Sequence, residues 1–240
     1  MNRAIKYRIE PTKEQRVMFA KTFGCCRKIY NLMLADKIEY YKQTGKSLMT
    51  TPAQYKKDYP YLKEVDSLAL ANAQLHLQSA YKNFFENPKS GFPKFKSARR
   101  CRKAYTTNNR KGTVAISGHY IRLPKAGKVK IILHREPDVS WKLKSATVSQ
   151  DSDGKYYASV LFEYETQVAD IPVSDNAIGL DYKSDGLYMD SEGNTGSGHK
   201  FYRESQRKLA KAQRKLRHMT VGSKNYNKQQ RKISKIHKKI

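Results

Sequence analysis

Long apolar runs are missing from this sequence of 240 residues. None approaches the roughly 20 apolar residues that cross a bilayer, and the first segment, charged from Arg3 onward, lacks the apolar core of a signal peptide. Cysteine is scarce: Cys25, Cys26 and Cys101 are odd in number and two are adjacent, which is a poor disulfide framework. These absences predict a reducing, cytoplasmic location and no membrane partner.

Several site motifs are also missing. No Cys-x-x-Cys pair is present for a zinc ribbon, the six histidines lack metal-ligand spacing, and there is no Walker loop or nucleophile elbow. Acidic residues are few, with 21 Asp and Glu against 48 Lys and Arg, so the net charge is +27. Such a chain attracts polyanions. With 17 Tyr and 8 Phe, whose rings can stack on unpaired bases, the composition indicates a nucleic-acid-binding protein.

The first hundred residues predict one strand and two helices. Residues 3–9 alternate as a strand, and Thr12 with Gln15 has the spacing of a capping box, so a helix should begin there. Its apolar stripe is Phe19, Phe23, Cys26, Tyr30, Met33 and Leu34. Ser67 is suited to cap a second helix, with a stripe of Leu70, Ala73, Leu77, Tyr81 and Phe84. This pair resembles a helix-turn-helix, and the cysteines fit as small core residues.

After residue 103 the pattern changes to strands. Residues 113–117 and 120–123 flank Gly118-His119, a two-residue hairpin turn. Residues 128–134 alternate as a further strand, and 146–150 and 155–164 flank the turn at 151–154. We therefore expect an antiparallel unit of about five strands, a small barrel, which the strand at 3–9 completes with the helices inserted.

The next segment contains a candidate catalytic acid. After a linker at 172–176, the apolar strand 177–180 runs into Asp181, then the turn Ser184-Asp185-Gly186 and a second strand at 187–190. RNase H-like folds place their first metal ligand in this way, and such sites hold two divalent ions. None of the later acids (Asp185, Asp190, Glu192, Glu204) lies in a new strand-like segment, so the site is incomplete. An ordinary acid at a strand end is the alternative for Asp181.

Residues 201–240 read as basic helix, with fourteen Lys or Arg and Glu204 as the one acid. Tyr202, Leu209 and Leu216 are seven apart, which predicts two helices joined near Gly222 along a narrow seam. The basic faces would then contact phosphates, through Arg207, Lys211, Arg214, Lys224, Asn225, Lys228 and Arg231. The sequence ends within this pattern without a capping signal, which indicates a truncated chain.

Polar residues near the helix–strand boundary are candidates for reading target DNA. They are Asn72, Gln74 and His76 on the second helix, and Thr106, Thr107 and Asn108 at the start of the β unit. Amide, hydroxyl and imidazole groups suit base edges and phosphates. The alternative is that Asn72 and Gln74 are simply solvated helix positions.

Specific motifs resemble one family throughout the chain. YRIEPTKEQ, KTFGCCRKIYN, LKEVDS, KNFFEN, GFPKFKS, IRLPKAGKVK, IGLDYKSDGLYMDSEGN and the basic helices after it follow, in order, the TnpB-type transposon-associated RNA-guided endonucleases. The resemblance implies an α+β, multi-domain protein. A wedge β-barrel would comprise 1–10 and 101–171, a helical recognition lobe 11–100 would be inserted in it, and 175–240 would begin an incomplete RNase H-like RuvC domain.

The resemblance also implies a function. The family binds a guide RNA and double-stranded target DNA beside a transposon-adjacent motif, and cleaves DNA with Mg²⁺ at a RuvC site. Asp181 matches its first catalytic, metal-binding Asp. The family's catalytic Glu, its Zn²⁺ ribbon and its last catalytic Asp would all lie beyond residue 240, so cleavage by this chain alone is not expected. The alternatives are a nuclease-inactive RNA-guided repressor and a general RNA-binding protein.

Overall fold

The computed structural model of this chain describes residues 1–165, 177–183, 186–196, 198 and 200–240. It divides into two compact units, Met1–Glu165 and Thr166–Ile240. Across these described ranges, no helix is both long enough and apolar enough to cross a membrane.

The first strand, β1 (Asn2–Glu10), lies inside the main sheet. It pairs antiparallel with β7 (Tyr156–Glu163) on one side and with β5 (Gly127–Ile132) on the other. Ile5, Tyr7 and Ile9 are buried while their neighbours are exposed, as the alternation predicts. The full order is β2-β6-β7-β1-β5-β4-β3, and the remaining strands are β2 (Lys103–Asn108), β3 (Ala115–Ser117), β4 (Tyr120–Leu123) and β6 (Lys142–Gln150).

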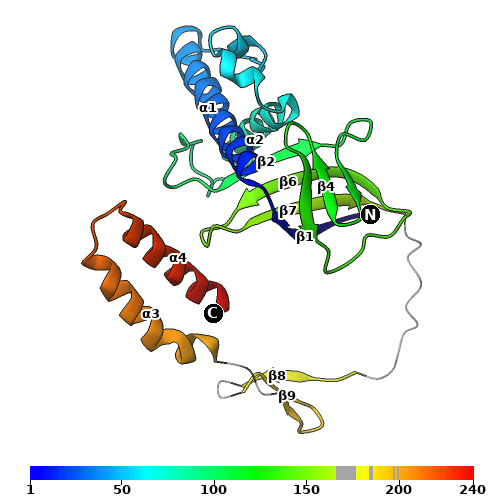
Figure 1. Cartoon of the computed structure of the whole chain (residues 1–240), viewed down its shortest axis with the longest axis vertical. Coiled ribbons are helices and arrows are strands. Elements are labelled where there is room, and N and C mark those ends of the chain that lie inside the picture. The colour runs from blue at the N-terminus through cyan, green and yellow to red at the C-terminus, as the bar shows by residue number, and fades with distance from the viewer. Residues whose placement is uncertain (166–176, 184–185, 197, 199) are drawn as a thin grey trace. The chain divides into compact units, whose positions relative to one another are not determined.

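This sheet confirms the expected hairpins and the insertion of the helices after the first strand. It is curled but open, with β2 and β3 as its edges (Figure 1), so the expectation of a closed small barrel was wrong. The side chain of Asn109, which follows β2, links β6 to the residue before β3. Its Nδ2 donates to the carbonyl oxygen of Leu143 at 3.0 Å, and its Oδ1 accepts from the backbone N–H of Val114 at 3.1 Å.

Helix α1 (Lys13–Thr44) begins at the predicted capping box. The hydroxyl of Thr12 accepts from the backbone N–H of Gln15 at 3.3 Å, and Gln15 Oε1 accepts from the N–H of Thr12 at 3.0 Å. The helix ends at Gly45, whose φ of 66° is the left-handed conformation that glycine adopts without strain. The whole predicted apolar stripe is buried.

Helix α2 (Ser67–Glu86) is capped one residue earlier than predicted. Asp66 Oδ1 accepts from the N–H of Leu68 at 3.1 Å, whereas the Ser67 hydroxyl accepts from Lys56 Nζ. Leu70, Ala73 and Leu77 are buried as expected. Two short 3-10 helices, η1 (Gln54–Lys56) and η2 (Pro60–Lys63), lie between α1 and α2.

Both long helices pack against β2, and Figure 1 shows them next to that edge of the sheet. The ring of Phe19 lies 6.2 Å from that of Tyr105 and 5.8 Å from that of Tyr156, and Phe23 contacts Tyr105 at 5.8 Å. Tyr105 is buried, and the loss of solvent raises the pKa of its hydroxyl strongly. An aromatic cluster thus joins the helices to the sheet.

The second unit contains a small sheet of β8 (Leu180–Tyr182), β9 (Tyr188–Asp190) and β10 (Thr195–Gly196). The predicted strand pair is confirmed, but β8 covers Leu180–Tyr182 instead of 177–180, so Asp181 lies within the strand and not after it. Ser184 and Asp185 of the predicted turn and the predicted linker at 172–176 lie outside the described residues.

Two basic helices, α3 (Phe201–Arg217) and α4 (Lys224–Lys239), form the predicted pair with a turn at Gly222, whose φ is 85°. The seam differs from the prediction, because Tyr202 is exposed. Leu209 of the predicted seam is buried on α3, together with Ser205 and Ala212, and Gln229 Nε2 from α4 donates to the carbonyl oxygen of Ala212 at 2.9 Å.

The buried pair between Asp66 and Thr107 predicts a measurable stability loss. Thr107 Oγ1 donates to Asp66 Oδ2 at 2.5 Å, so Asp66→Ala removes a helix cap and also leaves a buried hydroxyl unpaired. We expect a loss of about 2–4 kcal/mol in the free energy of unfolding, measured by urea denaturation. Glu64→Ala is the control, because its ion pair with Lys21 is exposed to solvent and contributes little to stability. Equal losses for the two variants would contradict this role of Asp66.

Candidate nucleic-acid interface

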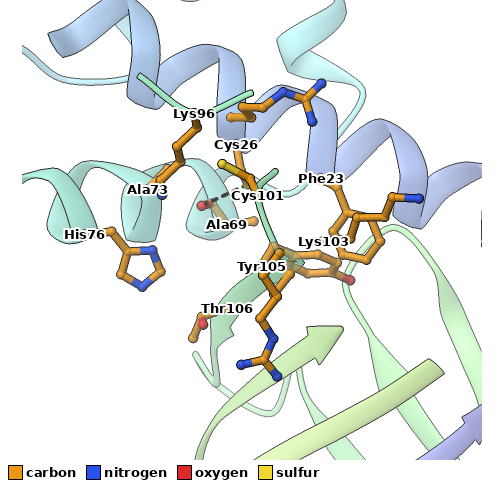
Figure 2. A pocket seen from close by; sticks show the side chains of 13 residues that line it. Phe23, Cys26, Ala69, Ala73, His76, Lys96, Cys101, Lys103, Tyr105 and Thr106 are labelled. Atoms are coloured by element: carbon orange, nitrogen blue, oxygen red, sulfur yellow. Dashed lines mark hydrogen bonds between the residues drawn. The ribbon is translucent and has the colours of Figure 1, made fainter. Parts of the chain in front are cut away.

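A basic recess lies where α1, α2 and β2 meet, and Figure 2 shows the side chains that line it. It is small, about 50 Å³, and its floor contains Phe23, Ala69, Ala73 and Tyr105. Its cationic lining residues come from three separate segments: Arg27, Lys96, Arg102 and Lys103. Its lining residues include no carboxylate among those that the structure describes, so the recess is suited to an anion.

Lys96 is the most firmly positioned of these cations. Its backbone is held by Asn31, which donates from Nδ2 to the Lys96 carbonyl at 2.9 Å and accepts from its N–H at 2.8 Å. Its ammonium lies 3.9 Å from the centre of the Tyr30 ring, a cation–π contact. Partial burial lowers the pKa of Lys96. A desolvated, fixed cation gains more from an added phosphate than a solvated one does.

Two of the six predicted target-reading residues line this recess, and two more are at least partly exposed on α2 and β2. His76 and Thr106 line it, Gln74 is partly exposed on α2, and Asn108 is exposed at the end of β2. Thr106 shares a hydrogen bond of 2.8 Å with Thr147 on β6. Desolvation, and secondly the charge of Lys96, lower the pKa of His76, which favours a neutral imidazole that both donates and accepts.

Asn72 and Thr107 do not fit this role. Thr107 is completely buried and its hydroxyl is bound to Asp66. Asn72 is 8% exposed, and its Nδ2 donates to the carbonyl oxygen of Leu68 within α2. Neither side chain is available to a base or phosphate, and we leave both out of the interface.

The sequence interpretation missed the recess cations Arg27, Lys96, Arg102 and Lys103. A signal existed for two of them, because residues 99–103 read Arg-Arg-Cys-Arg-Lys directly before the first strand of the β unit. No sequence signal indicated Arg27 and Lys96, because these two residues come together only when α1 packs against the segment after α2.

The basic residues predicted on the helical pair are all exposed. Arg207, Lys211 and Arg214 lie on α3, and Lys224, Asn225, Lys228 and Arg231 lie on α4. Because Leu209, Ala212 and Gln229 occupy the seam, these side chains project away from it. The pair therefore presents a second cationic surface.

Asp181 lies on β8 and is exposed. It pairs with Met189, whereas Asp190 pairs with Leu180, so the alternation of strand side chains directs the two carboxylates to opposite faces. Asp190 is further engaged by the N–H groups of Glu192 and Asn194. Over the part of the chain that the structure describes, no three His, Cys, Asp or Glu residues gather as a metal site. These residues therefore do not fit the expected pair of Mg²⁺ ions.

Several known proteins are similar to this chain in sequence. A family described as a helix-turn-helix domain, HTH_OrfB_IS605, matches residues 1–46. A candidate RNA-guided DNA endonuclease from Streptomyces pristinaespiralis is 32% identical over all of this chain and 60% of its own length. A second such protein, InsQ from Escherichia coli, is 29% identical over 99% of this chain and 59% of its own.

Among solved structures, a chain of a CRISPR-Cas12f ternary complex matches 90% of this chain and 55% of its own, at 14% identity and a TM-score of 0.42, which is too weak to define the fold. The sequence relatives and the helix-turn-helix match make this chain similar to RNA-guided DNA endonucleases of the TnpB type. The chain spans about 60% of the length of these two curated relatives.

Cysteine labelling tests the recess. Burial raises the pKa of Cys26 to about 12 and also raises that of Cys25, so few thiolates form at pH 8, whereas Cys101 is partly exposed at the recess. We expect iodoacetamide to modify Cys101 first, and bound nucleic acid to slow that reaction severalfold, as followed by mass spectrometry. Cys101→Ser is the control that removes native-state labelling. An unchanged Cys101 rate in a saturated complex would place the ligand elsewhere.

Proposed function

We propose that this chain binds a guide RNA and double-stranded target DNA beside a short adjacent motif. The observation that carries the proposal is the recess in which Asn31 and Tyr30 hold Lys96. A cation fixed in this way contacts a phosphate without first losing side-chain freedom, and so sets the position of the nucleic acid against β2.

Sequence reading at this site would come from the polar residues around the fixed cation. His76 lines the recess, and Gln74 on α2 and Asn108 at the end of β2 have accessible side chains. An amide binds adenine through two hydrogen bonds, and a neutral imidazole both donates and accepts. We infer that these three groups read base edges while the recess cations hold the backbone.

The helical pair would supply backbone affinity without sequence selection. Its exposed cations lie on two helices whose narrow seam buries Leu209 and Ala212 beside two polar residues, so the charged side chains remain in solvent. Cations on such a surface bind phosphates by releasing condensed counterions, which makes the affinity depend steeply on salt. We infer that structured RNA is the ligand of this surface.

We further propose that Asp181 is the first catalytic carboxylate in a chain of the relatives' full length, where additional carboxylates would hold Mg²⁺ together with it. In the described part of this chain its partners are not assembled. Binding is therefore the activity that these residues support by themselves, and a role as a nuclease-inactive binder is the second candidate.

The salt dependence of RNA binding tests the helical pair. Changing Lys211, Arg214, Lys228 and Arg231 together to Gln should lower the slope of log affinity against log salt, by about 0.7–0.9 for each lost phosphate contact. Exchanging Lys for Arg and Arg for Lys at the same positions is the matched control, because the charge is kept. An identical slope in the Gln variant would assign the RNA surface to another region.

Asp181 is tested in a fusion that joins this chain to the part of a longer relative that the chain does not span. Asp181→Asn should abolish guide-dependent cleavage of DNA while target affinity, measured by gel shift, stays unchanged, because the loss of one metal-binding oxygen disrupts the ions and not the contacts to DNA. Glu192→Gln, at an exposed turn of the same sheet, is the control and should cleave normally. Cleavage by the Asp181 variant at the normal rate would remove Asp181 from the site.

A further inference from the structure

An aromatic pocket lies away from the basic recess, between the later turns of α1 and α2. Its volume is about 540 Å³, within the range of small-molecule sites. Helix α2 supplies Tyr81, Phe84 and Phe85, the segment after it supplies Phe92, and α1 with the residues that follow it supplies Tyr41 and Leu48. The sequence pattern indicated two of these rings, Tyr81 and Phe84, only as core residues.

The rings are arranged at angles that leave faces open. Tyr81 and Phe85 are close to parallel, at 21° with centroids 6.4 Å apart. Phe92 stands edge-on to Tyr81 at 5.6 Å and to Phe84 at 5.4 Å. Such a corner accepts a further flat ring, which can stack on one face and meet the edge of another.

These rings remain largely in water. Phe85 is 77% exposed, Tyr41 62% and Phe92 45%. Each Å² of apolar surface that stays in solvent forgoes about 25 cal/mol of the stabilisation that burial would give. Grouped exposed aromatics of this kind mark a binding surface rather than an ordinary part of a monomer's exterior.

The charge of the pocket selects the kind of partner. Its lining includes Lys37 and Lys42 and, among the described residues, no carboxylate. Lys37 Nζ lies 5.8 Å from the centre of the Tyr81 ring and donates to the carbonyl oxygen of Leu48, and burial lowers its pKa. Flat apolar faces beside cations complement a base and its phosphate. A second copy of this chain, with its net charge of +27, would be repelled.

We propose that this pocket binds an unpaired nucleobase of a single-stranded segment, which stacks on the rings of Phe85 and Phe92 while Lys37 and Lys42 contact the flanking phosphates. This inference rests on the proposed nucleic-acid binding and adds a second, stacking site to it. The Gln78 amide, which also lines the pocket, is placed to contact the edge of the base.

The test compares three hairpin probes with the same stem: blunt, with a six-nucleotide RNA tail, and with a six-nucleotide DNA tail. The full 240-residue chain is used, and affinity is measured by fluorescence anisotropy. In the double variant Phe85→Ala/Phe92→Ala we expect roughly a tenfold loss for a tailed probe, equivalent to about 1.4 kcal/mol, and no loss for the blunt probe. The tail that shows the loss identifies RNA or DNA as the source of the base.

Two variants separate stacking from a structural effect. Tyr120→Ala, which removes an exposed ring from β4, should bind all three probes normally. Phe85→Trp keeps a stacking face and should retain tail binding. A 2-aminopurine placed in the tail should change its fluorescence on binding to the normal chain and not to the double variant.

The contrary outcomes are distinct from one another. An equal loss for blunt and tailed probes, or no loss for either, would overturn the stacking site while leaving nucleic-acid binding in place. A change in self-association by sedimentation, without any tail-dependent loss, would assign the pocket to a second copy of the chain and overturn the proposal. A normal chain that binds none of the probes would overturn the proposed function itself.

Discussion

The carboxylate of Asp66 holds the helical insertion and the sheet together. One of its oxygens caps the first turn of α2 and the other accepts the hydroxyl proton of Thr107 inside β2. Both of its contacts are satisfied in a buried setting, where an unpaired partner would be costly. Because α2 carries His76 and β2 carries Thr106, this one group fixes the two walls of the basic recess relative to each other.

The position of Lys96 depends on that frame. Its segment follows α2, and Asn31 of α1 binds its backbone on both sides, so a loop residue is held as firmly as one in a strand. The Lys96 ammonium lies over the face of the Tyr30 ring. The free-energy cost of removing water from the Lys96 ammonium is therefore incurred when the chain folds. More of its attraction to a phosphate then remains to favour binding.

Local signals in the sequence were sufficient to predict the helices and strands but not the contacts between them. The capping box at Thr12 and the hairpin at Gly118 each depend on a few neighbouring residues, and both were predicted correctly. The pairing of Asp66 with Thr107 spans 41 residues, so no local pattern could indicate it. No local pattern could indicate the contact of Lys96 with Asn31 either, because these two residues are also far apart in the sequence. Strand alternation, however, could have excluded Thr107, since Tyr105 and Thr107 share the buried face of β2 while Asn108 is exposed.

The same alternation constrains any metal chemistry at Asp181. In the antiparallel pair of β8 and β9, Asp181 shares a face with Met189, and Asp190 shares the opposite face with Leu180. A group that completes a two-ion site with Asp181 must therefore approach over the Met189 face. Asp190 cannot move there without a one-residue slip of the register, which would turn every side chain of β9 over. Hydrogen bonds between Gly179 and Ser191, at the end of this strand pair, hold that register in place. Of the two acids in the described strands β8 and β9, Asp181 alone lies on the Met189 face, so further carboxylates would come from outside these strands.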